Sequence, residues 1–177
     1  DPTYIEPYAD DILGIVLTHA HEDHLGAVHW LWPRLKAPVF ATPFTAFLLR
    51  EKLRDADLLG EVDITEVPLG GSFKLGPFEL ELITLTHSIP EPNGLAIRTP
   101  LGTVLHTGDW KLDPDPLVGD TTDEAALKQL GEDGVLAAQS TTSSKSRKAN
   151  ASSTHVSSTT RPPSRSCKPG RWTRNRT

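Results

Sequence analysis

One short motif constrains the fold of this chain more than any other feature. The apolar run Ile12–Thr18 has the length and composition of a buried strand, and it ends at the sequence HAHEDH, residues 19–24. Three of the 7 histidines in the chain therefore follow one strand, together with an aspartate. We interpret the chain as a mixed α and β fold whose strands end at polar side chains able to bind a metal.

The remainder of residues 1–138 continues this mixed pattern. A short helix that carries Leu25, Val28 and Trp32 on one face is expected to end at Pro33. Alternating and apolar segments, punctuated by Gly and Pro, predict further strands at 38–41, 62–67, 73–75, 78–86, 95–99, 103–107 and 135–138. The strands at 95–99 and 103–107 form a hairpin. A further helix is predicted at 123–130.

The segment 42–54 is also predicted to be helical. Its large apolar residues follow a helical period: Phe44, Phe47, Leu48 and Leu53. Thr42 or Thr45 is the candidate N-terminal cap.

The spacing H-x-H-x-D-H is suited to metal binding. In an extended segment, residues i and i+2 point to the same side, so His19 and His21 can bind one ion. Asp23 and His24 lie where the chain turns into the helix, which favours two adjacent metals over one. Imidazole nitrogens and carboxylates are ligands that Zn²⁺ accepts.

Two later residues are further candidate ligands. His87 and Asp109 each come directly after a predicted strand. The Asp109 carboxylate can bridge two ions, which are roughly 3.5–4 Å apart in two-metal hydrolases. His106 alternates with Leu105 on a strand, so it fits a core histidine or a residue that supports a ligand as well as it fits a ligand. We assign no metal role to Glu22, His29 or His155.

Charge divides the chain into two unlike parts. Residues 1–138 contain 9 Lys and Arg against 23 Asp and Glu, a net charge of −14, whereas residues 139–177 contain 9 Lys and Arg and no acid, a net charge of +9. We predict an acidic globular domain over 1–138 and a basic, disordered tail over 139–177. A single cysteine excludes an internal disulfide framework, and no apolar run is long enough for a membrane span.

Two stretches resemble a known family. LTHAHEDHLGAVHWLW (17–32) and THSIPEPNGLAIRTPLGTVLHTGDWKLDPDPLVGD (86–120) resemble the metallo-β-lactamase superfamily, and within it the β-CASP ribonucleases of the ribonuclease J type. H-x-H-x-D-H specifies only the superfamily, whereas HSIPE and HTGDWK together with it point to ribonuclease J. The resemblance covers residues 1 to about 138 and implies a partial αββα metallo-β-lactamase sandwich that lacks an edge of its first sheet.

The resemblance also implies roles for the candidate ligands. One Zn²⁺ would be held by His19, His21 and His87, and the other by Asp23 and His24, with Asp109 bridging both. The ions would share a water and lower its pKa, and the resulting hydroxide would attack a phosphodiester of RNA, which makes Asp23, His24 and Asp109 the catalytic residues. The implied activity is a zinc-dependent ribonuclease of the bacterial cytoplasm that cuts RNA from the 5′ end and internally. Full-length family proteins can form homo-oligomers.

Some family features have no counterpart in this sequence. The opening pair of strands, the β-CASP domain and a late histidine ligand of the second zinc are missing, and the chain opens on Asp1 without any Met. We therefore expect a fragment that binds one zinc more tightly than two and has weak or no nuclease activity. Two alternatives are a small-molecule metallo-hydrolase of the same fold and an inactive metal-binding remnant.

Residues from about Thr142 admit two interpretations. Only Ser140 and Thr141 match the family's Ser-Asp-Ser-Thr-Asn stretch. Loss of one nucleotide from codons for Ser-Thr-Asn-Val-Phe-Lys-Glu yields Ser-Thr-Thr-Ser-Ser-Lys-Ser, which is the sequence of residues 140–146. We favour out-of-frame translation. The alternative is a genuine basic tail that binds RNA phosphates in a salt-dependent manner.

Overall fold

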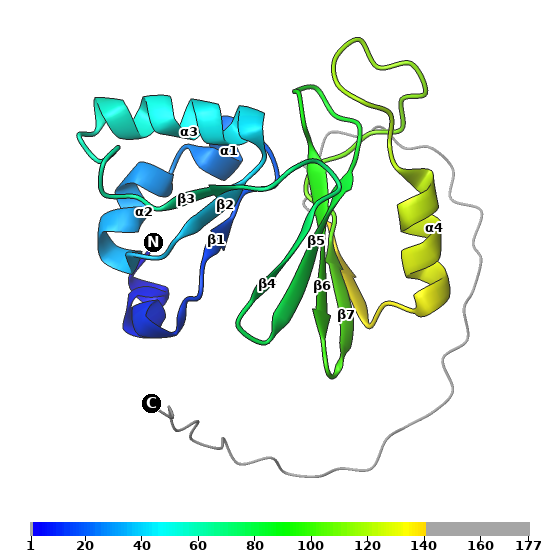
Figure 1. Ribbon diagram of the computed structural model, residues 1–177, viewed down its shortest axis with the longest axis horizontal. Coiled ribbons are helices and arrows are strands. Elements are labelled where there is room, and N and C mark those ends of the chain that lie inside the picture. The colour runs from blue at the N-terminus through cyan, green and yellow to red at the C-terminus, as the bar shows by residue number, and fades with distance from the viewer. Residues whose placement is uncertain (1, 141–177) are drawn as a thin grey trace. The chain divides into compact units, whose positions relative to one another are not determined.

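The computed structural model describes residues 2–140 (Figure 1). The chain divides into two units, Asp1–Ser144 and Lys145–Thr177, and every described residue belongs to the first. The predictions for residues 141–177 of the basic tail and for a frame error from about Thr142 therefore lie outside the described residues. Gln139, which the sequence assigned to the disordered tail, instead lies in the last strand of the second sheet. The domain boundary between residues 138 and 139 stays a prediction.

A parallel three-stranded sheet forms the first half of the fold. Its strands, in spatial order, are β1 (Ile15–Val16), β2 (Val39–Ala41) and β3 (Ile64–Glu66). Two 3₁₀ helices precede it, η1 (Pro2–Tyr4) and η2 (Glu6–Asp11). The parallel strands are connected by α1 (Glu22–Leu25) and α2 (Val28–Leu35), and then by α3 (Pro43–Asp55). The predicted strand over 12–18 is thus shorter in the structure.

A five-stranded sheet forms the second half. Its spatial order is β4 (Ser72–Leu75), β5 (Phe78–Thr84), β6 (Asn93–Thr99), β7 (Gly102–His106) and β8 (Ala137–Gln139). Neighbours pair antiparallel from β4 to β7, and β8 pairs parallel to β7. The predicted hairpin is confirmed as β6–β7. Helix α4 (Glu124–Asp133) precedes β8, and the Asp123 carboxylate caps it by accepting from the Ala126 N–H at 2.9 Å.

Alternation of side chains along the strands builds four layers. Val39 and Ala41 pack with α2 and α3 in one core cluster, whereas Phe40 packs with Leu80 and Leu82 of the second sheet. On the other face of β5, Ile83 and Leu85 pack against Leu130 of α4. The layers are helix, sheet, sheet and helix, as Figure 1 shows for the labelled elements. This confirms the predicted αββα sandwich. Every helix within residues 2–140 is too short or too polar to cross a bilayer.

The prediction that Pro33 ends a helix is wrong. Pro33 lies inside α2, which continues to Leu35 and ends at Lys36, a residue with a left-handed φ of 49°. A proline in a helix removes one backbone hydrogen bond and introduces a clash with the preceding turn. Burial of the apolar face that includes Trp32 and Leu35 outweighs this cost, and the Trp32 indole N–H also donates to the Ala37 carbonyl at 2.9 Å.

Helix α3 confirms the predicted helical segment, but only some of the apolar residues on the helical period are buried. Leu53 is buried, whereas Phe47 is 57% exposed, and the helix buries three other residues: Thr45, Ala46 and Leu49. Thr42 occupies the N-cap position, yet its hydroxyl donates to Thr45 Oγ1 at 3.2 Å and does not cap the helix backbone. Periodicity alone therefore does not establish which side of the helix packs against the core.

Candidate metal centre

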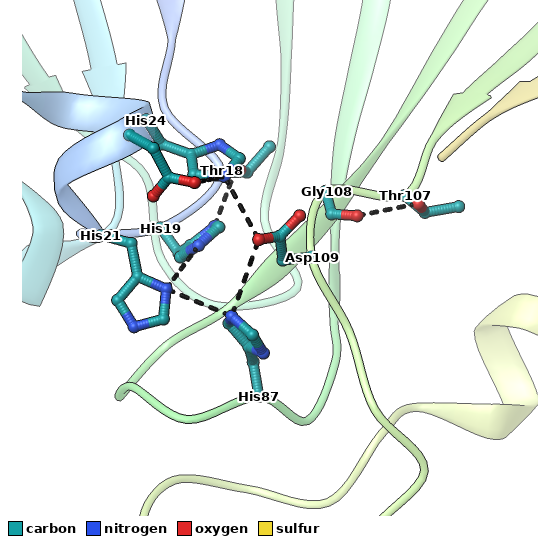
Figure 2. A network of polar contacts seen from close by, with 9 residues as sticks. Thr18, His19, His21, His24, His87, Thr107, Gly108 and Asp109 are labelled. Atoms are coloured by element: carbon teal, nitrogen blue, oxygen red, sulfur yellow. Dashed lines mark hydrogen bonds and ion pairs between the residues drawn. The ribbon is translucent and has the colours of Figure 1, made fainter. Parts of the chain in front are cut away.

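The candidate ligands come together where strands of both sheets end (Figure 2). His19 and His21 follow β1 of the first sheet, and His24 lies in α1 directly after them. His87 follows β5, and Asp109 follows β7, both of the second sheet. The fold therefore brings residues from three separate segments to one place, as expected from their positions at strand ends.

Three histidine nitrogens converge at the centre of this cluster. His19 Nε2 lies 3.1 Å from His21 Nδ1, and His87 Nε2 lies 3.1 Å from the same His21 atom. In a tetrahedral site with metal–nitrogen bonds of 2.0–2.1 Å, ligand nitrogens are roughly 3.3–3.4 Å apart. The three imidazoles thus have the chemistry and nearly the spacing that a tetrahedral metal ion requires, and they are the three histidines that the sequence assigned to the first ion.

A second group of candidate ligands overlaps the first. It consists of His19, His24 and Asp109, whose ligand atoms lie within 4.8 Å of one another. Asp109 Oδ2 is 3.5 Å from His24 Nε2 and 3.8 Å from His87 Nε2, so one carboxylate oxygen lies near ligands of both groups. This position suits the bridging role that the sequence predicts.

Asp23 lies at the margin of the cluster. Its Oδ2 is 3.8 Å from His24 Nε2, its side chain is 72% exposed, and it is in neither group of candidate ligands among residues 2–140. The structure groups His24 and Asp109 with His19, where the resemblance implied Asp23. The predicted role of Asp23 in metal binding and catalysis stays a prediction.

The orientation and protonation of His19 prepare it for metal binding. Its ring is fully buried, and Nδ1 lies 3.1 Å from Thr18 Oγ1, so that Nε2 is directed at the cluster. Burial, followed by the nearby His24, His21 and His87, lowers the pKa of His19 from 6.5 to about 4. Burial also lowers the pKa of His87, with His21 as the next contribution. Both rings are therefore neutral at pH 7, which leaves nitrogen lone pairs for an ion.

The lowered pKa predicts an acid-sensitive metal-free protein. Because the folded pKa of His19 lies below its unfolded value, the unfolded chain binds more protons between pH 6.5 and about 4. The free energy of unfolding should therefore fall as the pH is lowered through this window, and the His19 contribution should be constant above and below it. Urea unfolding midpoints of the chelator-treated chain and of His19→Gln at pH 7, 5.5 and 4 test this. An equal pH dependence in both proteins contradicts the prediction.

Two other histidines considered from the sequence lie outside both groups of candidate ligands. His106 is half-buried on β7, where burial and then the nearby His24 lower its pKa. His29 lies on α2. Neither has a place among the candidate ligands of residues 2–140.

Two further residues, neither of which was a predicted site residue, connect the loops that carry the candidate ligands. Gly108 has φ +57°, and a Cβ there would lie 2.9 Å from the Asn93 carbonyl oxygen and 3.3 Å from Thr18 Cβ, so the turn before Asp109 fits only glycine. Asn93 is fully buried, and its backbone N–H and Nδ2 donate to the Thr18 carbonyl at 3.0 and 3.3 Å. The only local signal was the Gly-Asp pair; nothing in the sequence around Asn93 marked it.

Comparisons with known proteins agree with this geometry. Residues 2–130 match the family described as the β-lactamase superfamily domain. Ribonuclease J of Sinorhizobium meliloti is 47% identical over 137 residues, which covers 77% of this chain and 24% of that protein. Ribonuclease J of Thermus thermophilus is 39% identical over 140 residues, with 75% and 24% covered. The chain thus spans about a quarter of the length of these relatives.

A solved structure shares the fold. A metallo-β-lactamase from Cronobacter sakazakii with a HARLDQ motif has a TM-score of 0.50 and 21% identity to this chain, covering 75% of this chain and 57% of that one. At this level of identity, the likeness concerns the arrangement of the elements.

Proposed function

Because the chain belongs to the metallo-β-lactamase superfamily, we propose that it is part of a ribonuclease of the ribonuclease J kind, which hydrolyses phosphodiester bonds in RNA. The observation that carries the proposal is the convergence of the His19, His21 and His87 nitrogens beside the Asp109 carboxylate. The similarity to the two ribonucleases J supports RNA as the substrate. We propose zinc as the metal because imidazole nitrogens and a carboxylate are ligands that it accepts. We propose the bacterial cytoplasm as the location because the sequence resemblance implies it.

In this proposal, the side chains of the site have different roles in metal binding. His19, His21 and His87 would hold one ion, and Asp109 would reach from it toward a second ion beside His24. Bound divalent ions lower the pKa of a water and stabilise charge on phosphoryl oxygens. Neutral imidazoles at pH 7 need not lose a proton before binding. The Asp109 carboxylate would offset part of the positive charge of bound ions.

The proposal is tested with the full chain, an RNA substrate and defined metal. The chain is freed of metal by chelation and supplied with zero, one or two equivalents of Zn²⁺ or Mn²⁺, and the cleavage of a 5′-monophosphorylated, end-labelled RNA is followed. We expect cleavage only with metal, and its loss on renewed chelation. Hydrolysis of an acyl thioester or a lactone without RNA cleavage would instead identify a small-molecule hydrolase. Metal binding without turnover of any of these substrates would indicate an inactive metal-binding protein.

A further inference from the structure

Glu91, the last residue of the HSIPE sequence, contacts a helix that is distant in the chain. Its Oε2 accepts a hydrogen bond from the Phe44 backbone N–H at 2.9 Å, and Phe44 is the second residue of α3. The first N–H groups of a helix have no partner within the helix. Thr42, at the N-cap position, supplies no side-chain cap. Glu91, which lies in a loop of the second sheet, therefore caps the N-terminus of α3 in place of Thr42.

The backbone at Glu91 adopts a conformation that its neighbours must maintain. Its φ is +53°, in the left-handed region that residues other than glycine rarely occupy, and Pro92 follows it. Such a conformation costs free energy and persists where surrounding contacts fix it. Two contacts do so here: the carboxylate binds the Phe44 N–H, and the Glu91 carbonyl accepts from Asn93 Nδ2 at 2.7 Å.

Asn93 extends this connection to the other ligand loop. The Thr18 carbonyl accepts from both the backbone and the side chain of Asn93, and the Thr18 hydroxyl contacts His19 Nδ1. A continuous series of polar contacts thus runs from the start of α3 through Glu91 and Asn93 to the buried His19. The same loop begins at His87, which Figure 2 shows approaching the cluster from a segment separate from His19 and His21.

We propose that Glu91 is a positioning residue of the metal centre, which fixes the turn that holds His87 beside His21 by capping α3. This inference rests on the metal site of the proposed function. In the group of His19, His21 and His87, only His87 comes from the second sheet. Without the Glu91 contact, the loop from 87 to 93 can relax, and the 3.1 Å separation between His87 Nε2 and His21 Nδ1 is no longer enforced.

The test compares Glu91→Ala with Glu91→Gln in the full chain, with Co²⁺ as a spectroscopic probe. Apparent affinity is measured by competition with a chromophoric chelator, and coordination by the visible absorption of bound Co²⁺. Removing the contact in Glu91→Ala should weaken binding by roughly 10–100-fold, the range seen when supports of metal ligands are lost. It should also alter the Co²⁺ spectrum. Glu91→Gln keeps a carbonyl oxygen as acceptor and should restore most of the affinity and the spectrum.

Glu61→Ala is the matched control. It also removes one glutamate, but Glu61 follows the C-terminal end of α3 and pairs with Lys36 at the surface. Its affinity and spectrum should equal those of the unchanged chain. Circular dichroism establishes that each variant is folded.

The outcomes separate this inference from the proposed function. If the unchanged chain binds neither Co²⁺ nor Zn²⁺, the metal site itself is wrong. If the unchanged chain binds metal and folded Glu91→Ala does so with equal affinity and an unchanged spectrum, the positioning role is overturned. Should Glu91→Ala fail to fold, Glu91→Asp decides, because it keeps the charge but shortens the reach to Phe44. A folded Glu91→Asp with unchanged affinity and spectrum overturns the role, and weaker binding with an altered spectrum supports it.

Discussion

His19→Gln should bind divalent metal at least about 100-fold more weakly than the unchanged chain, more than the loss of a residue that only supports a ligand. His19 belongs to both groups of candidate ligands, so its replacement removes one donor from each. Its ring is fully buried, and glutamine fills a similar volume, which limits the cavity. Any metal-dependent hydrolysis should fall by roughly 10³-fold or more, because an ion contributes several kcal/mol and each 1.36 kcal/mol is a factor of ten.

Two further histidine variants serve as comparisons for the metal affinity of His19→Gln. His87→Gln removes a donor from only one group and should weaken binding less than His19→Gln. His29→Gln changes a histidine of α2 outside both groups and should leave metal affinity unchanged. Affinities come from competition with a chromophoric chelator at pH 7, after circular dichroism has established folding. If folded His19→Gln binds metal as tightly as His29→Gln does, the histidine cluster is not the metal site.

The candidate ligands could be predicted because their signals are local. A buried strand that ends at a polar residue is visible in a few consecutive positions, and this logic identified His19, His21, His87 and Asp109. The sharing of His19 between both groups could not be predicted in this way. It depends on the ring orientation that Thr18 sets and on how far the Asp23 side chain turns toward solvent.

The residues that hold the ligand loops were beyond the reach of local patterns. The Phe44–Glu91 contact spans 47 positions, and the contact between Thr18 and the Asn93 side chain spans 75. Hydrogen bonds of this kind have no sequence period, so neither Glu91 nor Asn93 could be distinguished from an ordinary loop residue. In the same way, the strand order was not predictable from the individual strands, although their positions mostly were.

The face of α3 shows a different limit of the sequence. The helical segment was correctly predicted, but its period did not establish which side of the helix packs against the core. The structure buries Leu49 completely and leaves Phe47 57% exposed. Since the two residues lie on the same helix, they form a matched pair with which to measure where the core lies.

Leu49→Ala should lower the free energy of unfolding by about 2–5 kcal/mol, because it removes buried methyl groups and leaves a cavity among tightly packed neighbours. These neighbours include Val39 and Ala41 of β2 in the same core cluster. Phe47→Ala, at a more exposed position, should change stability by about 0.5 kcal/mol or less. Urea unfolding followed by circular dichroism gives both values, provided that the m-value is unchanged. A larger loss for Phe47→Ala than for Leu49→Ala would show that the side of α3 that carries Phe47 is the buried one.

Metal should raise the stability of these two variants equally. A ligand that binds only the folded state stabilises it by about 2.7 kcal/mol at a free concentration 100 times its Kd. Neither Leu49 nor Phe47 belongs to the candidate ligand groups, so their effects should add to that of the metal. Glu91→Ala should differ: it destabilises α3 at its first turn and also weakens the metal site, so added metal should restore less of its stability. A smaller metal effect in Leu49→Ala as well would mean that the packing of α3, and not its cap, determines the geometry of His87.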